Sequence, residues 1–359
     1  MKERMLASGK GSLVARTLAG SWRIAGRASL QLSQAELDEV TPLLYGSGGA
    51  ALGWWRVREM ELRSSPSAEV LHQAYQLQVL QSGIHEQKIQ KVFRLLRAES
   101  IEPILVKGWS AALFYPDQAL RPYGDIDICV QPKDFRAAEI VLARPEAADC
   151  WVDLHKRFEQ LGERSVEDLL SRSRLVDLND DKIRILSLED HVALLAIHLL
   201  KHGAWRPLWL CDIGAAVESV SSDFDWSLCF GRNKKKASWI ICVIGLANLL
   251  LDAKIDHLTF AKEARELPDW LVATVLKQWN APFSLNQPPM SHPEPMSNYL
   301  LHPRGLFRAL GKRWPDPIIA TVSVNGRFTK FPRLPYQLGN CGTRIAQFLL
   351  RLPRLSSAK

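Results

Sequence analysis

The chain has 359 residues, of which 47% are apolar and 23% are charged, so its composition is that of a folded protein and excludes a disordered one. This length allows two domains and an additional terminal subdomain. The formal net charge of +8 would suit a polyanionic partner, but a basic, solvated surface also explains it.

Three features of the sequence indicate a cytoplasmic protein without stable membrane insertion. Six cysteines lie far apart, with no CxxC pair, which is typical of free thiols in a reducing compartment. Residues 1–30 contain no unbroken apolar segment of the kind found in signal peptides. The longest apolar run, residues 239–251, is shorter than the ~20 residues of a membrane span and predicts a buried helix. Because basic residues 232–236 precede this run, a helix lying on a membrane surface is the alternative.

The hydrophobic pattern divides the chain into five regions. They are a basic, flexible N-terminus (1–30), an N-terminal helical region (31–100), an α/β core (101–165), a helical domain (166–280) and a Pro/Arg-rich C-terminal region (281–359). In the helical regions, apolar residues recur at intervals of three and four, and Gly46–Gly49 marks a turn between two helices.

Strands and helices alternate in the α/β core. Strands are expected at 103–106, 126–130 and 151–155, and helices at 109–115 and 133–142. This pattern predicts an α+β fold, in which a small mixed sheet with helices packed on it is flanked by N-terminal helices and a C-terminal helical bundle. The bundle helices are expected at 187–203, where Ser187 is the N-cap, and at 208–217, 239–251 and 267–279. Residues 282–295 read as a linker, and the C-terminal region as irregular structure ending in a helix near 343–352.

Two aspartates share one face of the second expected strand. Alternation along the strand places Asp125, Asp127 and Cys129 on this face, and the intervening apolar residues on the core face. The two carboxylates would lie roughly 7 Å apart along the strand. Two such unpaired acids repel each other, and a divalent cation would relieve this repulsion.

A third carboxylate is expected from the next strand. In residues 151–155, Val152 and Leu154 face the core, and Asp153 faces the opposite side. If the two strands are neighbours, Asp153 joins Asp125 and Asp127 in a set of oxygen ligands that suits Mg²⁺ or Mn²⁺.

The turn after the first strand has the properties of a phosphate-binding turn. Gly108 allows close backbone approach, Ser110 adds a hydroxyl at the start of a helix, and Lys107 adds a positive charge. Arg121 lies between this turn and the acids, where it could clamp phosphate oxygens or pair with Asp117.

Several segments together resemble an uncharacterised bacterial nucleotidyltransferase family within the DNA polymerase β-like superfamily. They are residues 105–108, 115–117, 120–127, 152–155, 188–202 and 205–213, with 313–318 and 332–338 similar to one branch of the family. Trp109 stands between Gly108 and Ser110, where the superfamily has Gly followed directly by Ser, and only residues 128–152 separate Asp127 from Asp153.

The resemblance implies an enzyme that transfers a nucleoside monophosphate from an NTP to an unidentified hydroxyl acceptor and releases pyrophosphate. ATP is the expected donor because it is the most abundant NTP. Asp125 and Asp127 would hold two metal ions, and Asp153 would bind the ion that activates the acceptor hydroxyl. The residues implied around the nucleotide are Lys107, Gly108, Ser110, Arg121 and Gly124.

Two other functions remain open at the level of sequence. The same fold could serve a nucleotide-binding or toxin–antitoxin-type regulatory protein without transfer activity. A nucleic-acid-associated protein is possible but not indicated, because the arginines of the C-terminal region are too scattered to form a basic groove.

His191, His198 and His202 share one helix face, where packing, substrate contact and zinc binding are the alternatives in that order. Asp212 is expected to be a structural hydrogen-bond acceptor, and the tryptophans near it to belong to the core.

Overall fold

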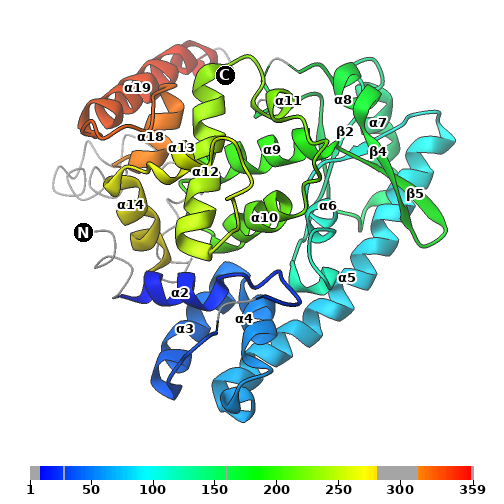
Figure 1. The fold of residues 1–359 in the computed structure, drawn as a ribbon. Helices are drawn as coiled ribbons and strands as arrows, with labels where there is room; N and C mark the ends of the chain where they lie inside the picture. The colour runs from blue at the N-terminus through cyan, green and yellow to red at the C-terminus, as the bar shows by residue number, and fades with distance from the viewer. Residues whose placement is uncertain (1–8, 27–28, 159, 163, 281–313, 357–359) are drawn as a thin grey trace.

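The computed structural model describes residues 9–26, 29–158, 160–162, 164–280 and 314–356, with side chains to residue 346. The fold is α+β, as expected: a five-stranded mixed sheet lies on one side of the molecule, and helices surround it and fill the rest (Figure 1). The long helix α5 (Pro66–Ala98) runs beside the sheet, and the helices of the C-terminal half lie on the other side (Figure 1).

The sheet has the strand order β3-β2-β1-β5-β4. The strand bounds are β1 Ile104–Leu105, β2 Ile126–Cys129, β3 Val152–His155, β4 Arg174–Leu178 and β5 Asp181–Ile185. Strand β2 pairs in parallel with β3 and antiparallel with β1, which in turn pairs in parallel with β5. The hairpin β4–β5 corrects the sequence analysis, which expected only helices after residue 165. It turns at Asn179, whose φ of 51° lies in the left-handed region that Asn tolerates.

Strand β2 is covered on both faces. Ile126, Ile128 and Val130 pack in a cluster with apolar residues of α5 and α7 (Phe135–Leu142), as expected for the core face. Cys129, on the opposite face, packs in the larger cluster that the C-terminal helices form. Asp127 shares that face and is only 3% exposed, so the acidic face is not an open surface.

The N-terminal helices are α2 (Lys10–Leu18), α3 (Gln34–Ser47), α4 (Ala50–Val57) and α5. Helix α2 corrects the expectation of a flexible N-terminus, because Leu13 and Leu18 are buried in the larger cluster. Arg23, which follows this helix, pairs with Glu218 and Asp252 and is buried. The predicted turn between two helices is confirmed, because Gly48 and Gly49 separate α3 from α4.

The C-terminal half contains the expected bundle. Its helices are α8 Val166–Arg172, α9 Leu188–Lys201, α10 Pro207–Glu218, α11 Trp226–Phe230, α12 Lys234–Leu251, α13 Ala261–Arg265 and α14 Asp269–Trp279. Ser187 caps α9 by accepting a hydrogen bond from Asp190 N, as predicted. The apolar run 239–251 lies within α12, and most of its residues are buried. No helix in the described ranges is both long enough and apolar enough to span a bilayer.

The C-terminal region is more regular than expected. Residues 282–295, the predicted linker, lie outside the described residues. Helix α18 (Pro317–Ser323) was not predicted, and α19 (Leu334–Ser356) begins earlier than the helix expected near 343–352. Asp316 explains the start of α18, because its carboxylate accepts hydrogen bonds from Ile318 N and Ile319 N.

Gly245 allows α12 and α13 to approach each other closely. A Cβ atom at this position would lie 1.8 Å from the carbonyl oxygen of Ala264. We expect Gly245→Ala to destabilise the protein by about 1–3 kcal/mol, because the two helices would have to separate. Gly83→Ala in α5 is the control, since a Cβ there meets no atom within 4 Å. Urea unfolding should show the loss only for Gly245→Ala, and an equal midpoint for the two variants would contradict this account.

Candidate functional site

The parallel pairing of β2 and β3 brings two acids together. Asp127 lies directly opposite Asp153 in the register, and Ile126, Ile128 and Cys129 pair with Val152, Leu154 and His155. This confirms the expected neighbourhood of the two strands. Directly opposed residues in a sheet project to the same face, so both carboxylates lie on one side of it.

His155 joins these two acids. Its Nε2 lies 3.1 Å from Oδ1 of Asp127 and 3.2 Å from Oδ2 of Asp153. The three residues form a group that could hold a metal ion, with ligand atoms all within 4.8 Å of one another. The sequence analysis assigned no role to His155. Its position two residues after Asp153 on a strand, and therefore on the same face, is the signal that could have identified it.

Lys107 is a further partner of Asp127, and the cationic one. Its Nζ lies 2.8 Å from Oδ1 of Asp127, and its side chain is mostly buried. Burial opposes ionisation of Asp127, but the hydrogen bond from His155 and the charge of Lys107 outweigh it, so the pKa of Asp127 is lowered. The carboxylate is therefore ionised at neutral pH and paired, and not unpaired as the sequence analysis assumed.

Gly124 and Asp125 lie just before β2 and are exposed. Asp125 does not belong to the metal-capable group of Asp127, Asp153 and His155, although it is only two positions from Asp127 in sequence. The structure thus brings together Asp127 and Asp153 of the expected acids, and it places Asp125 in solvent just before the start of β2.

The turn after β1 lies against the backbone of Asp125. Gly108 has a φ of 69°, and a Cβ there would lie 3.5 Å from the carbonyl oxygen of Asp125. Ser110, in the short helix α6 (Trp109–Ala112), is 1% exposed, and its hydroxyl has no hydrogen-bond partner among the described residues. The expected phosphate turn is therefore adjacent to the acids, but its hydroxyl is enclosed.

Arg121 has a different partner from those expected. Its guanidinium donates to both carboxylate oxygens of Asp212, with an Nη2–Oδ2 distance of 2.8 Å, and Tyr115 donates to the same carboxylate. Asp212 is completely buried, which confirms its structural role as an acceptor. Asp117 instead accepts hydrogen bonds from Tyr75 and from Ala119 N. The clamp predicted for Arg121 would require this buried pair to open.

His191 and His198 of α9 and His202, which caps its C-terminus, lie in different surroundings. His191 is fully buried, its ring nitrogens have no partner among the described residues, and burial with the charge of Arg121 lowers its pKa to about 3. His198 and His202 contact each other, with ring centroids 4.5 Å apart, and both contact Trp209. Neither belongs to the metal-capable group of the described residues.

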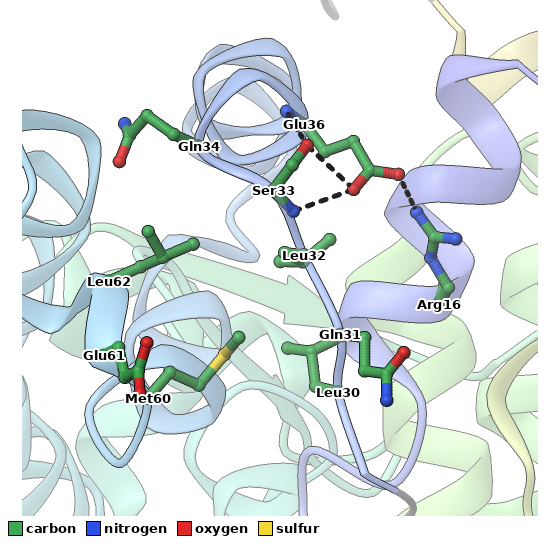
Figure 2. A pocket seen from close by; sticks show the side chains of 10 residues that line it. All are labelled: Arg16, Leu30, Gln31, Leu32, Ser33, Gln34, Glu36, Met60, Glu61 and Leu62. Carbon is green, nitrogen blue, oxygen red and sulfur yellow. Dashed lines mark hydrogen bonds and ion pairs between the residues drawn. The ribbon is translucent and has the colours of Figure 1, made fainter.

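A pocket of about 660 Å³ lies elsewhere, between α3 and the segment around Met60 (Figure 2). Three of its polar lining residues already bind one another: Ser33 and Glu36 form a capping box, and Arg16 pairs with Glu36 (Figure 2). None of the residues grouped around Asp127 lines it.

Comparison with known families identifies the chain. The sequence model of a family described as uncharacterised nucleotidyltransferase matches residues 32–149 and 144–244, which is more than half of the chain. The chain belongs to this family. Both matched segments contribute to the candidate site of this nucleotidyltransferase-family protein, because β1, β2 and Lys107 lie in the first and β3 and α9 lie in the second. No curated protein and no solved structure matches the chain.

Proposed function

We propose that this protein is a metal-dependent nucleotidyltransferase that transfers a nucleoside monophosphate from an NTP to a hydroxyl group. The observation that carries the proposal is the group formed by Asp127, Asp153 and His155 beside a glycine turn, in a chain of a nucleotidyltransferase family. Two carboxylates, with an imidazole within hydrogen-bond distance of both, fit a divalent cation such as Mg²⁺ or Mn²⁺. A divalent ion bound there would neutralise charge on the phosphate oxygens and lower the pKa of the acceptor hydroxyl.

The residues around Asp127 have separate roles in this proposal. Asp127 and Asp153 would hold the cation, His155 would orient both carboxylates, and Asp125, exposed just before β2, would complete the acidic set. Lys107 neutralises Asp127 without metal. With Asp127 bound to a cation, the ammonium group of Lys107 would be available to bind a phosphate, next to the N–H groups that follow Gly108.

The reaction is an in-line displacement at the α-phosphorus. The acceptor oxygen forms a bond to this phosphorus, the bond from phosphorus to the oxygen that bridges to the β-phosphate breaks, and pyrophosphate leaves. The acceptor proton passes to Asp153, whose side chain is 58% exposed and is the most accessible of the three grouped side chains. The burial of Asp127 keeps its carboxylate in a fixed position during the displacement.

Transfer of label from α-labelled NTPs to components of a cell extract tests the proposal. We expect transfer in the presence of Mn²⁺ or Mg²⁺, and none from the double variant Asp125→Ala with Asp127→Ala. EDTA should abolish the signal in the wild-type protein. Transfer that persists in the double variant, or no transfer with either metal, would reject the enzymatic function. Metal-dependent NTP binding without transfer would instead support the regulatory, non-catalytic alternative.

A further inference from the structure

Arg206 is held in place by three neighbours from two parts of the fold. It precedes α10, and its Nε donates a hydrogen bond of 2.9 Å to the carbonyl oxygen of Ser47, the last residue of α3. Its guanidinium carbon lies 5.6 Å from the ring centroid of Trp209 and 6.0 Å from that of Trp205. Gly48 gives it room, because a Cβ atom there would lie 2.4 Å from Nη2. The orientation of this side chain is therefore fixed.

Arg206 has no carboxylate partner within the described part of the chain, whereas three other arginines with mostly buried side chains have one. Arg121 pairs with Asp212, Arg23 with Glu218, and Arg164 with Asp190. No described acceptor contacts Nη1 or Nη2 of Arg206. Burial and repulsion from Arg121 lower its pKa to about 10, while Asp212 and Asp125 act in the opposite direction. The side chain remains charged at neutral pH, and a half-buried charge without a counter-ion favours the binding of an anion.

This charge lies within electrostatic range of the candidate site, because Arg121 and Asp125 act on the pKa of Arg206. Trp209 contacts Arg206 on one side and the rings of His198 and His202 on the other. Burial is the main cause that lowers the pKa of His198 and His202, and the charge of Lys107 is the second. The two histidines are therefore within electrostatic range of the lysine that contacts Asp127. Helix α10 begins directly after Arg206, and the positive end of its dipole adds to the potential at this position.

We infer that Arg206 binds the non-reacting phosphates of the NTP, an inference that rests on the proposed function. The fork of a guanidinium matches two phosphate oxygens, and the Ser47 carbonyl and the tryptophan rings hold it before the ligand arrives. The turn between α3 and α4 thereby acquires a role in substrate binding, through the position of Arg206. Lys107 and Arg206 together supply two cations for a triphosphate chain.

Calorimetric titration of the full chain with ATP, tripolyphosphate and adenosine tests this inference. We expect Arg206→Gln to weaken the binding of ATP and tripolyphosphate roughly tenfold to a hundredfold, the usual effect of losing a charge-assisted pair of hydrogen bonds. Arg206→Lys should fall between this variant and the wild type, because it keeps the charge and loses the fork. Adenosine binding should not change. Arg58→Gln is the matched control, since Arg58 lies 3.2 Å from the ring centroid of Trp55 but has Glu59 as its partner.

Equal binding of tripolyphosphate by Arg206→Gln and the wild type would overturn the inference, as would a wild-type protein that binds no tripolyphosphate. If Arg206→Gln lost as much affinity for adenosine as for ATP, the role of Arg206 would be structural instead. The label-transfer assay separates the two proposals. Transfer with unchanged tripolyphosphate binding in Arg206→Gln would reject only the inference, and Arg206-dependent binding without any transfer would reject only the enzymatic function.

Discussion

Asp127→Asn is expected to lower the rate of nucleotidyl transfer roughly a hundred- to thousandfold, which corresponds to the several kcal/mol that a metal ion contributes to a transition state. Asp127 is the buried member of the metal-capable group and contacts both His155 and Lys107. The asparagine retains the shape of the side chain but not its charge, so Lys107 and the cation both lose their counter-ion. Initial rates of label transfer over a range of Mn²⁺ concentrations would measure the loss.

Two further variants show whether the lower transfer rate of Asp127→Asn arises at the metal-capable group. His155→Gln should cost about tenfold to a hundredfold, the usual effect of removing a residue that orients metal ligands. Asp177→Asn is the matched control, because Asp177 is an exposed aspartate on strand β4 of the same sheet, paired with Lys182. We expect full activity from it. Activity of Asp127→Asn within threefold of the wild type would show that Asp127 holds no essential cation.

Asp212→Ala is expected to destabilise the fold by about 3–5 kcal/mol, the typical cost of breaking a buried ion pair by removing one partner. The carboxylate is fully buried and accepts hydrogen bonds from Arg121 and Tyr115. Without it, the Arg121 guanidinium would remain buried and charged, and the Tyr115 hydroxyl would lose its partner. Guanidinium unfolding followed by circular dichroism would measure the change.

The control for this prediction is the exposed pair of Lys182 and Asp177, whose side chains are 65% and 75% exposed. Asp177→Ala should leave the unfolding midpoint nearly unchanged, since solvent screens such a pair. The double variant Arg121→Met with Asp212→Leu should recover most of the stability lost in Asp212→Ala, because no charge remains buried. A small effect of Asp212→Ala would mean that water reaches Arg121.

Sequence pattern was sufficient for the part of the sheet that carries the acids. Strict alternation over 126–130 and 151–155 predicted both strands and the faces of Asp127 and Asp153, and the structure confirms their pairing. The hairpin β4–β5 was missed because its strands carry charged residues such as Arg174, Asp177 and Arg184, which weaken the apolar alternation on which the prediction depended. The Asn179-Asp180 turn was the available signal.

Contacts between distant parts of the chain could not be predicted in this way. The pair of Arg121 and Asp212 joins residues far apart in sequence, and a single sequence contains no measure of which charged residues meet. The same holds for the contact of Lys107 with Asp127, since it depends on side-chain geometry between the turn after β1 and strand β2. Hydrophobic periodicity does not show which distant residues meet, and the structure does.

The position of β2 between two apolar clusters has a consequence for how this site can change in evolution. One face of the strand packs with α5 and α7, and the other packs with the C-terminal helices. Any shift of the backbone at Asp127 would require compensating substitutions in both clusters at once, and such combinations are rare. Under the proposed function, new acceptors would therefore be accommodated most readily by substitutions at exposed residues near Asp153 such as Trp151, which is 74% exposed, while the position of Asp127 stays constant.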